Sequence, residues 1–177
     1  DVAGTYLIAL VVNDGLQDSV ADSVSVIAED YVVTLPPDPE DVAPPLDLTV
    51  ATTLDVASEY LYTGDDPIQT GVEQGTIDPL RVAVLRGKVT TRDGAPLSGT
   101  VITVLDHPEY GQTLSREDGV FDLAVNGGGR MTLIYKRPGF LTAQRQREVP
   151  WQDYAWMPQV ALIPLDATVS HIDLDEP

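Results

Sequence analysis

The stretch Leu85–Val125, LRGKVTTRDGAPLSGTVITVLDHPEYGQTLSREDGVFDLAV, decides the fold of this chain. At its start, Leu85, Gly87 and Val89 are separated by two basic residues. An alternation with period two is typical of a β-strand that buries one face. The stretch therefore predicts a half-buried strand at its beginning.

Two Asp-Gly dipeptides divide the rest of this stretch. Asp93-Gly94 tolerates positive φ and is predicted to close a hairpin, and Asp118-Gly119 is predicted to make a later turn. Between them we expect strands near 100–105 and 112–115, and another strand follows the second turn. Thr100, Ile102 and Val104 are expected on one face of the first strand, and Val101, Thr103 and Leu105 on the other. In the last strand, Phe121, Leu123 and Val125 alternate with Asp122 and Ala124.

Downstream residues continue the same pattern. Met131, Leu133 and Tyr135 predict the inward face of a further strand. Residues 141–149 are polar and charged, which is typical of an edge strand protected against aggregation. Residues 160–165 and 168–174 are predicted as closing strands. Short alternating strands separated by turns at intervals of about 8–12 residues indicate an all-β sandwich.

The order of glycines, turn residues and apolar residues resembles the carboxypeptidase-regulatory-like, or transthyretin-like, domain. The resemblance covers about residues 58–173. The flanking segments 61–72 and 149–156 are similar to the version in bacterial YD-repeat proteins and teneurins. The residues that carry the resemblance are Gly87, Val89, Asp93, Gly94, Pro96, Leu97, Gly99, Thr113, Asp118, Gly119, Phe121, Leu123, Pro138, Gly139 and Phe140.

The resemblance implies an immunoglobulin-like or transthyretin-like β-sandwich over residues 58–177. Such domains are mostly accessory. It therefore implies a non-catalytic structural or interaction module of a large extracellular bacterial surface or YD-repeat protein, which docks and spaces other domains. The expected partners are domains of the same polypeptide or neighbouring copies, so a homo-oligomer is one expectation. The hydrolysis performed by carboxypeptidases resides in a separate domain that this stretch does not contain.

Residues 1–30 predict two strands joined by a turn at Asn13-Asp14-Gly15. The opening Asp1-x-x-Gly4-x-Tyr6 resembles the tyrosine corner of immunoglobulin-like sandwiches. The segment thus looks like the last strands of a PKD-type domain and precedes the sandwich as a partial immunoglobulin-like segment. A two-stranded hairpin is marginal alone, so we expect another domain, a preceding segment or another chain to cover its apolar faces.

Residues 31–57 are interpreted as a Pro/Asp-rich linker. Five prolines between positions 36 and 45 favour an extended, semi-rigid backbone. Residues 48–54 are rich in β-branched side chains and favour a strand, whereas residues 55–60 favour a short helical turn.

The net charge of −18 is unevenly distributed. Residues 1–80 hold 16 acidic residues and no Lys or Arg, whereas residues 81–177 hold 12 acidic and 10 basic residues. This acidity disfavours binding of nucleic acid or of anionic membranes. No apolar run approaches the ~20 residues of a membrane-spanning helix, so membrane insertion is not expected. The chain begins at Asp1 without a methionine, and we interpret it as a piece of a longer, secreted or cell-surface protein.

Three aspartates are candidate calcium ligands. Asp14, Asp18 and Asp22 lie four residues apart beside the first turn, and calcium prefers several carboxylate and carbonyl oxygens. The spacing is not that of an EF-hand loop, and turn-forming, solvated aspartates are the alternative interpretation. No other cofactor is expected.

Aromatic and basic side chains form the candidate interaction residues. Trp151, Tyr154 and Trp156 can either stack on a ligand such as a sugar ring or cover one end of the core. Arg145 and Arg147 can form a basic strip that docks on an acidic region, or simply an exposed edge.

The sequence does not predict an enzyme. His107 and His171 are the two histidines, and neither has metal-ligand spacing to another histidine. Neighbouring positions of one strand point to opposite faces, so Ser170, His171 and Asp173 do not form a triad. No phosphate-binding glycine loop, nucleophile elbow or zinc-binding helix motif occurs.

Besides the docking module, two functions stay open at this stage. The first is a subunit of an extracellular filament or oligomer, in which residues 1–30 complete the sheet of a neighbour by strand addition. The second is an adhesion module that binds glycan or protein through the aromatic residues.

Overall fold

The computed structural model describes residues 4–28, 34–47 and 49–166 and divides the chain into two compact units, 1–34 and 35–177. The first unit contains an antiparallel hairpin of β1 (Gly4–Leu10) and β2 (Asp22–Ala28), as the sequence predicts. Its apolar side chains are exposed on both faces, among them Leu7, Ile8 and Ile27.

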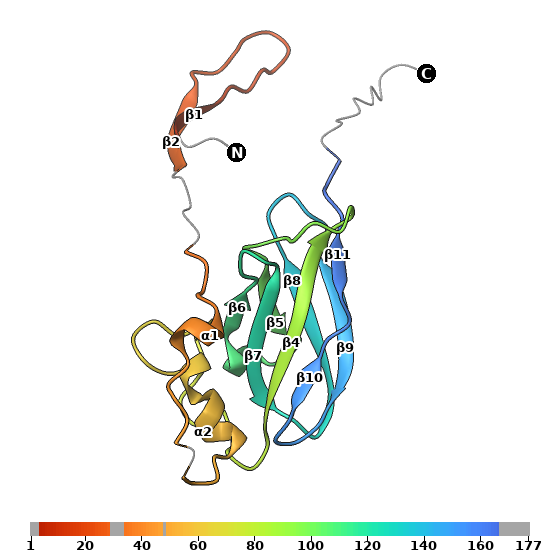
Figure 1. Ribbon diagram of the computed structural model, residues 1–177. Coiled ribbons are helices and arrows are strands. Elements are labelled where there is room, and N and C mark those ends of the chain that lie inside the picture. The colour runs from red at the N-terminus through yellow and green to blue at the C-terminus, as the bar shows by residue number, and fades with distance from the viewer. Residues whose placement is uncertain (1–3, 29–33, 48, 167–177) are drawn as a thin grey trace. The chain divides into compact units, whose positions relative to one another are not determined.

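The second unit is a sandwich of two sheets, which confirms the all-β fold class (Figure 1). One sheet centres on β4 (Val82–Thr91), with β7 (Val120–Asn126) antiparallel on one side. On its other side β10 (Tyr154–Trp156) and β11 (Val160–Leu162) pair with β4 in parallel, one after the other.

The second sheet has the order β3–β6–β5–β8–β9. Its strands are antiparallel, and their bounds are Gln69–Thr70 (β3), Gln112–Leu114 (β6), Val101–Val104 (β5), Gly129–Lys136 (β8) and Ala143–Val149 (β9). The polar strand β9 ends this order, so the predicted edge strand is confirmed.

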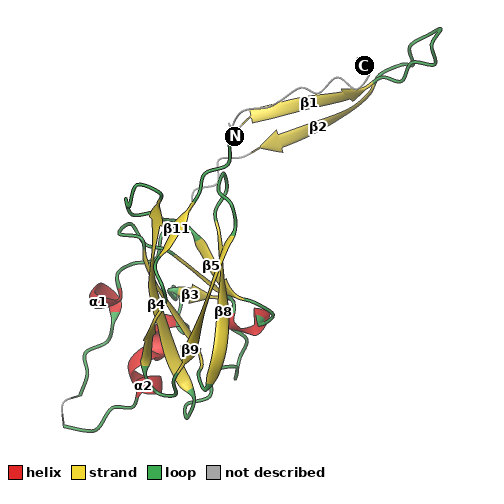
Figure 2. Cartoon of the chain, turned by 90° about the vertical axis from the view of Figure 1, so that its right-hand side faces the viewer, coloured by secondary structure: helices red, strands yellow, loops and turns green. Residues whose placement is uncertain are grey.

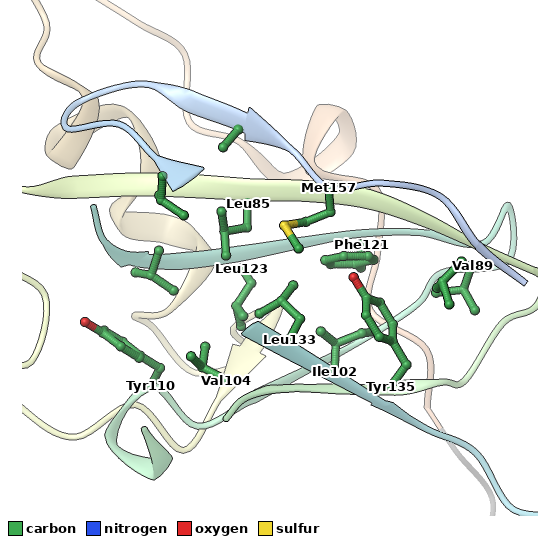
Figure 3. Packing of buried hydrophobic residues seen from close by; sticks show 14 of the residues in the cluster. Leu85, Val89, Ile102, Val104, Tyr110, Phe121, Leu123, Leu133, Tyr135 and Met157 are labelled. Atoms are coloured by element: carbon green, nitrogen blue, oxygen red, sulfur yellow. The ribbon is translucent and has the colours of Figure 1, made fainter. Parts of the chain in front are cut away.

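The core lies between the two sheets. The buried face of β5 contains Ile102 and Val104, and that of β7 contains Phe121, Leu123 and Val125. Of the predicted inward face of β8, Leu133 and Tyr135 are buried and Met131 is partly buried. The rings of Phe121 and Tyr135 meet edge to face with centroids 5.8 Å apart, and Met157 lies beside Phe121 (Figure 3). A Cβ at position 87 would lie 2.7 Å from the Phe121 ring, so glycine is needed there for this packing.

Helical segments cover part of the outer face of the β4 sheet (Figure 2). Helix α2 (Leu54–Ser58) continues into the 3₁₀-helix η1 (Glu59–Leu61), and Leu61 and Ile68 pack on Val84. Another short helix, α1 (Pro39–Val42), begins after Asp38, whose side chain accepts a hydrogen bond from the Glu40 amide. A further 3₁₀-helix, η2 (Pro108–Tyr110), lies between β5 and β6.

One prediction of secondary structure is wrong, and another is confirmed only locally. The turn at Asp93-Gly94 does close a short hairpin, in which Thr90 and Pro96 form an antiparallel bridge and the Leu97 amide donates a hydrogen bond to the Val89 carbonyl. It does not pair β4 with β5, because these strands belong to different sheets. Residues 49–53 form no strand, because the chain there leads into α2, whose Leu54 packs against the cluster on the outer sheet face.

The other predictions of secondary structure are confirmed in part. The helical turn expected over 55–60 is confirmed by α2 and η1, and the closing strand expected over 160–165 is confirmed by β11. The strand expected over 168–174 lies outside the described residues. The proline-rich segment is not extended throughout, since α1 interrupts it and Pro39 is buried in the second unit.

Candidate functional site: an exposed aromatic and arginine surface

The register of three strands defines a row of side chains on the outer face of the β4 sheet. Asp122 on β7 pairs with Arg86 on β4, and Arg86 pairs with Trp156 on β10. Directly paired residues of neighbouring strands point to the same face. The sheet therefore brings a carboxylate, a guanidinium and an indole together, although they come from three distant segments.

Two aromatic rings flank the guanidinium of Arg86. Its central carbon lies 5.5 Å from the Tyr154 ring centroid and 5.9 Å from the Trp156 ring centroid. Both distances are within the ~6 Å range of cation–π attraction. The rings remain 45% and 58% exposed, so they do not close the core. In this strand it is the small residue Ala155 that faces inward.

A buried carboxylate holds Arg86 in place. Asp122 is 0% exposed, and its Oδ1 accepts a hydrogen bond from Arg86 Nε at 2.6 Å. Its Oδ2 accepts one from Nη1 of the buried Arg116 at 2.7 Å. Burial lowers the pKa of Arg86, but the hydrogen bond and charge of Asp122 outweigh this, so the pKa is raised. One carboxylate therefore anchors two arginines.

A second arginine–aromatic pair lies near the start of β4. The Arg81 guanidinium carbon is 6.0 Å from the centroid of the Trp151 ring. The Trp151 indole approaches Gly128 so closely that a Cβ at this glycine would overlap its Nε1 atom. Trp151 is nevertheless 60% exposed. Glycine and arginine therefore fix the position of this ring and leave much of it open to solvent.

The predicted basic strip lies on the other sheet. Arg147 is exposed and Arg145 is half-buried on β9, where they pair in register with Met131 and Leu133 of β8. Arg147 lines an open groove of about 540 Å³ together with Arg130, Gln146 and Glu148. Its role as an interaction strip stays a prediction.

The predicted calcium ligands lie in the first unit. Asp14 Oδ1 accepts hydrogen bonds from two backbone amides of its own turn, and these bonds lower its pKa. Asp18 accepts a bond from the side chain of Asn13, and Asp22 begins β2. Across the described residues, no three His, Cys, Asp or Glu side chains gather as a metal-binding group. Calcium binding stays a prediction.

The histidine that the structure describes lies in an exposed loop. His107 Nδ1 is 2.8 Å from Glu109 Oε1, and this hydrogen bond lowers the pKa of Glu109. His107 lines an open groove of about 460 Å³ together with Thr70, Thr103 and Gln112. His171 lies outside the described residues, as do Ser170 and Asp173.

Sequence reasoning missed the anchoring network of Arg86, Asp122 and Arg116. Asp122 was expected on the polar face of its strand, and it does lie on that outer face, but side chains from other segments bury it. No spacing in the sequence signals this, because the three residues meet only through strand register and the loop before β7.

Such a surface suits recognition rather than catalysis. Trp, Tyr and Arg are the residue types most enriched at the energetic centres of protein interfaces. Their rings here are fixed by packing and by charge, so little side-chain entropy is lost when a partner covers them.

The two-sheet fold and its strand order define this part of the chain as an all-β, transthyretin-like sandwich. Residues 77–162 match the family model described as the Teneurin TTR-like domain. Over residues 77–162, just under half of its length, the chain is therefore similar to the transthyretin-like domain of teneurins.

Curated relatives agree with this match. Mouse Teneurin-3 is 31% identical over 144 residues, which are 78% of this chain and 5% of that protein. Mouse Teneurin-1 is 32% identical over 167 residues, 91% of this chain and 6% of that protein. Teneurin-m of Drosophila melanogaster is 39% identical over 89 residues, 50% of this chain and 3% of that protein. The chain therefore spans only a small part of the length of these relatives.

Solved structures give weaker matches. A 3-chlorocatechol 1,2-dioxygenase from Rhodococcus opacus has a TM-score of 0.42 and 11% identity, covering 55% of this chain and 65% of that one. A likeness at this level carries no argument about activity. No helix among the described residues is long and apolar enough to cross a membrane.

Proposed function

We propose that this chain is a non-catalytic β-sandwich module of a large extracellular protein, in which it docks and spaces neighbouring domains. The match to the Teneurin TTR-like domain supports the class of module. The similarity of segments 61–72 and 149–156 to bacterial YD-repeat proteins favours a secreted bacterial parent. The docking surface consists of Trp151, Tyr154, Trp156, Arg81 and Arg86, and we call it the aromatic–arginine surface.

The observation that carries this proposal is the exposure of three ordered aromatic rings beside an edge strand. A large aromatic side chain gains most by burial, so rings held open by packed arginines and a glycine indicate a surface kept for a partner. In the proposed parent protein, a neighbouring domain covers them.

Cysteine labelling tests the proposal directly, because the chain has no cysteine of its own. We would introduce Trp156→Cys, or Asp93→Cys in an exposed turn as the matched control, and measure the rate of maleimide labelling. We expect both positions to react rapidly in the isolated chain. In the longer parent protein, labelling at position 156 should slow at least tenfold, while position 93 remains reactive. Equal rates at position 156 in both proteins would contradict docking through this surface.

A second candidate is an oligomer or filament assembled by strand complementation. Its support is the hairpin of the first unit, which leaves apolar side chains exposed on both faces and has two unpaired edges among the described strands. Light scattering after size exclusion tests it by comparing the full chain with a version that begins at Leu35, the start of the second compact unit. A full chain that is monomeric at about 100 μM would refute this candidate.

The calcium prediction has a simple test. Titration of the chain with calcium chloride in a calorimeter should give saturable heat that disappears in Asp14→Asn with Asp18→Asn, if these carboxylates bind the ion. Lack of heat at millimolar calcium would refute it.

A further inference from the structure

The guanidinium of Arg86 has hydrogen-bonding capacity that the described part of the protein does not use. Arginine offers five N–H donors, and Asp122 engages the one on Nε. Asp122 is the only acceptor that this guanidinium meets among the described residues, so both terminal nitrogens remain available. The side chain is 32% exposed, which leaves the group accessible.

The ion pairs around Arg86 join two arginines and two aspartates among the described residues, although the chain as a whole is strongly acidic. Asp122 supplies one negative charge to two guanidinium groups, those of Arg86 and Arg116. A second carboxylate lies near Arg116, because its Nε is 3.9 Å from Oδ2 of the half-exposed Asp38. Arg116 is therefore near two carboxylates, whereas Arg86 has only Asp122 among the described residues and keeps N–H donors for a further acidic group.

The flanking rings set the shape of what can bind. The rings of Tyr154 and Trp156 lie within ~6 Å of the guanidinium and present apolar surface beside it. A carboxylate matches the two free nitrogens in a bidentate geometry. The rings then contact apolar side chains on both sides of that carboxylate.

We infer that the aromatic–arginine surface receives an extended protein segment that presents one Asp or Glu between apolar residues, with its carboxylate on Arg86. This inference rests on the proposed docking function and names the chemistry of the partner. An extended segment is favoured because β10 ends its sheet, so its outer edge can pair with another backbone. A polyanion such as nucleic acid is disfavoured by the net charge of −18.

Tryptophan fluorescence of the full 177-residue chain tests the inference. Trp151→Phe leaves Trp156 as the single tryptophan, directly beside Arg86. The probes are two capped peptides, Thr-Val-Glu-Val-Thr and its counterpart with Gln in place of Glu, titrated in 150 mM salt. We expect saturable quenching by the Glu peptide and at least tenfold weaker binding of the Gln peptide, because only the carboxylate pairs with the guanidinium.

Variants locate the effect. Arg86→Gln should weaken the Glu peptide at least tenfold, to the level of the Gln peptide, and Arg86→Lys should lie between because lysine keeps the charge but lacks the fork. Arg130→Gln removes another exposed arginine, paired with Glu148 on the other sheet, and should leave binding unchanged. Circular dichroism of each variant identifies any loss of folding, and Arg86→Lys is the variant expected to remain folded.

Several outcomes would overturn the inference. These are equal binding of the two peptides, unchanged binding in both Arg86 variants, and no saturable quenching by the Glu peptide up to about 5 mM. If a glucuronate oligosaccharide quenches Trp156 and the peptides do not, the carboxylate comes from a glycan and the protein partner is refuted. Protection of position 156 in the cysteine test, combined with failure of the peptide test, would retain the docking function and reject only this partner chemistry.

Discussion

Removal of the Asp122 carboxylate should destabilise the sandwich more than any exposed charge does. In Asp122→Ala, the buried Arg116 loses its 2.7 Å partner and Arg86 loses its 2.6 Å partner. Breaking a buried ion pair from one side costs about 3–5 kcal/mol, because the other charge is left uncompensated. Arg86 is partly exposed, so water replaces some of what it loses, and we expect about 4 kcal/mol in total.

Urea unfolding followed by far-ultraviolet circular dichroism near pH 7 measures this cost. With a denaturant slope of about 2 kcal/mol per molar, the midpoint should fall by about 2 M. The matched control is Glu148→Ala, which breaks the pair between Arg130 and Glu148, whose side chains are 65% and 69% exposed. The control should lose less than about 1 kcal/mol.

A triple variant separates charge from packing. Arg86→Met, Arg116→Met and Asp122→Leu together replace the network by apolar groups of similar length. Such replacements are often neutral or stabilising, so this protein should regain most of the stability that Asp122→Ala loses. A loss below about 1 kcal/mol in Asp122→Ala, or a triple variant no more stable than the single one, would refute the reasoning.

Three further changes test other parts of the fold, each by its own measurement. Gly111→Ala should lower the unfolding free energy, measured in urea, by at least about 2 kcal/mol, because φ at this glycine is +61° and the added Cβ would collide with a backbone carbonyl. The control is Gly129→Ala, whose Cβ meets nothing within 4 Å and which should change the unfolding free energy by less than about 1 kcal/mol. Burial raises the pKa of Tyr135, so the unfolded chain releases this proton first and stability falls as pH rises above about 10. Tyr135→Phe should remove that part of the alkaline loss of stability. It should also stabilise the folded protein slightly at pH 7, because the buried hydroxyl has no hydrogen-bond partner among the described residues. An unchanged dependence of stability on alkaline pH would contradict this. In thermal melts, Trp156→Ala should lower stability by less than about 1.5 kcal/mol, whereas Phe121→Ala should lower it by about 3–5 kcal/mol. Equal losses in the two variants would show that Trp156 belongs to the core.

Alternation in the sequence predicts the inward faces of this sandwich well. Ile102, Leu123 and Tyr135 all lie where period two places them, because one face of each strand has to leave water. The pairing of the strands could not be predicted in this way. The turn at Asp93-Gly94 closes only a short hairpin, and the strands on its two sides then pair elsewhere, β4 with β7 and β5 with β8.

The sequence predicted only part of the candidate site. Trp151, Tyr154 and Trp156 stand out as an aromatic cluster, but their exposure depends on Ala155 being the inward residue of β10. The role of Arg86 depends on the register that sets it between Asp122 and Trp156. Register between segments about 35 and 70 residues apart is a tertiary property, and a single sequence gives no signal of it.

The parallel strands β10 and β11 have a consequence for synthesis of the protein. They pair with β4 only after about seventy more residues have left the ribosome. Until then, one edge of the central strand is bare, and Ala155, Met157, Val160 and Leu162 are missing from the core. A nascent chain that stalls before these strands presents a template for any passing β-strand, including β10 and β11 of a second copy. Exchange of these two strands between molecules is therefore the misassembly to look for when the protein is produced at high yield.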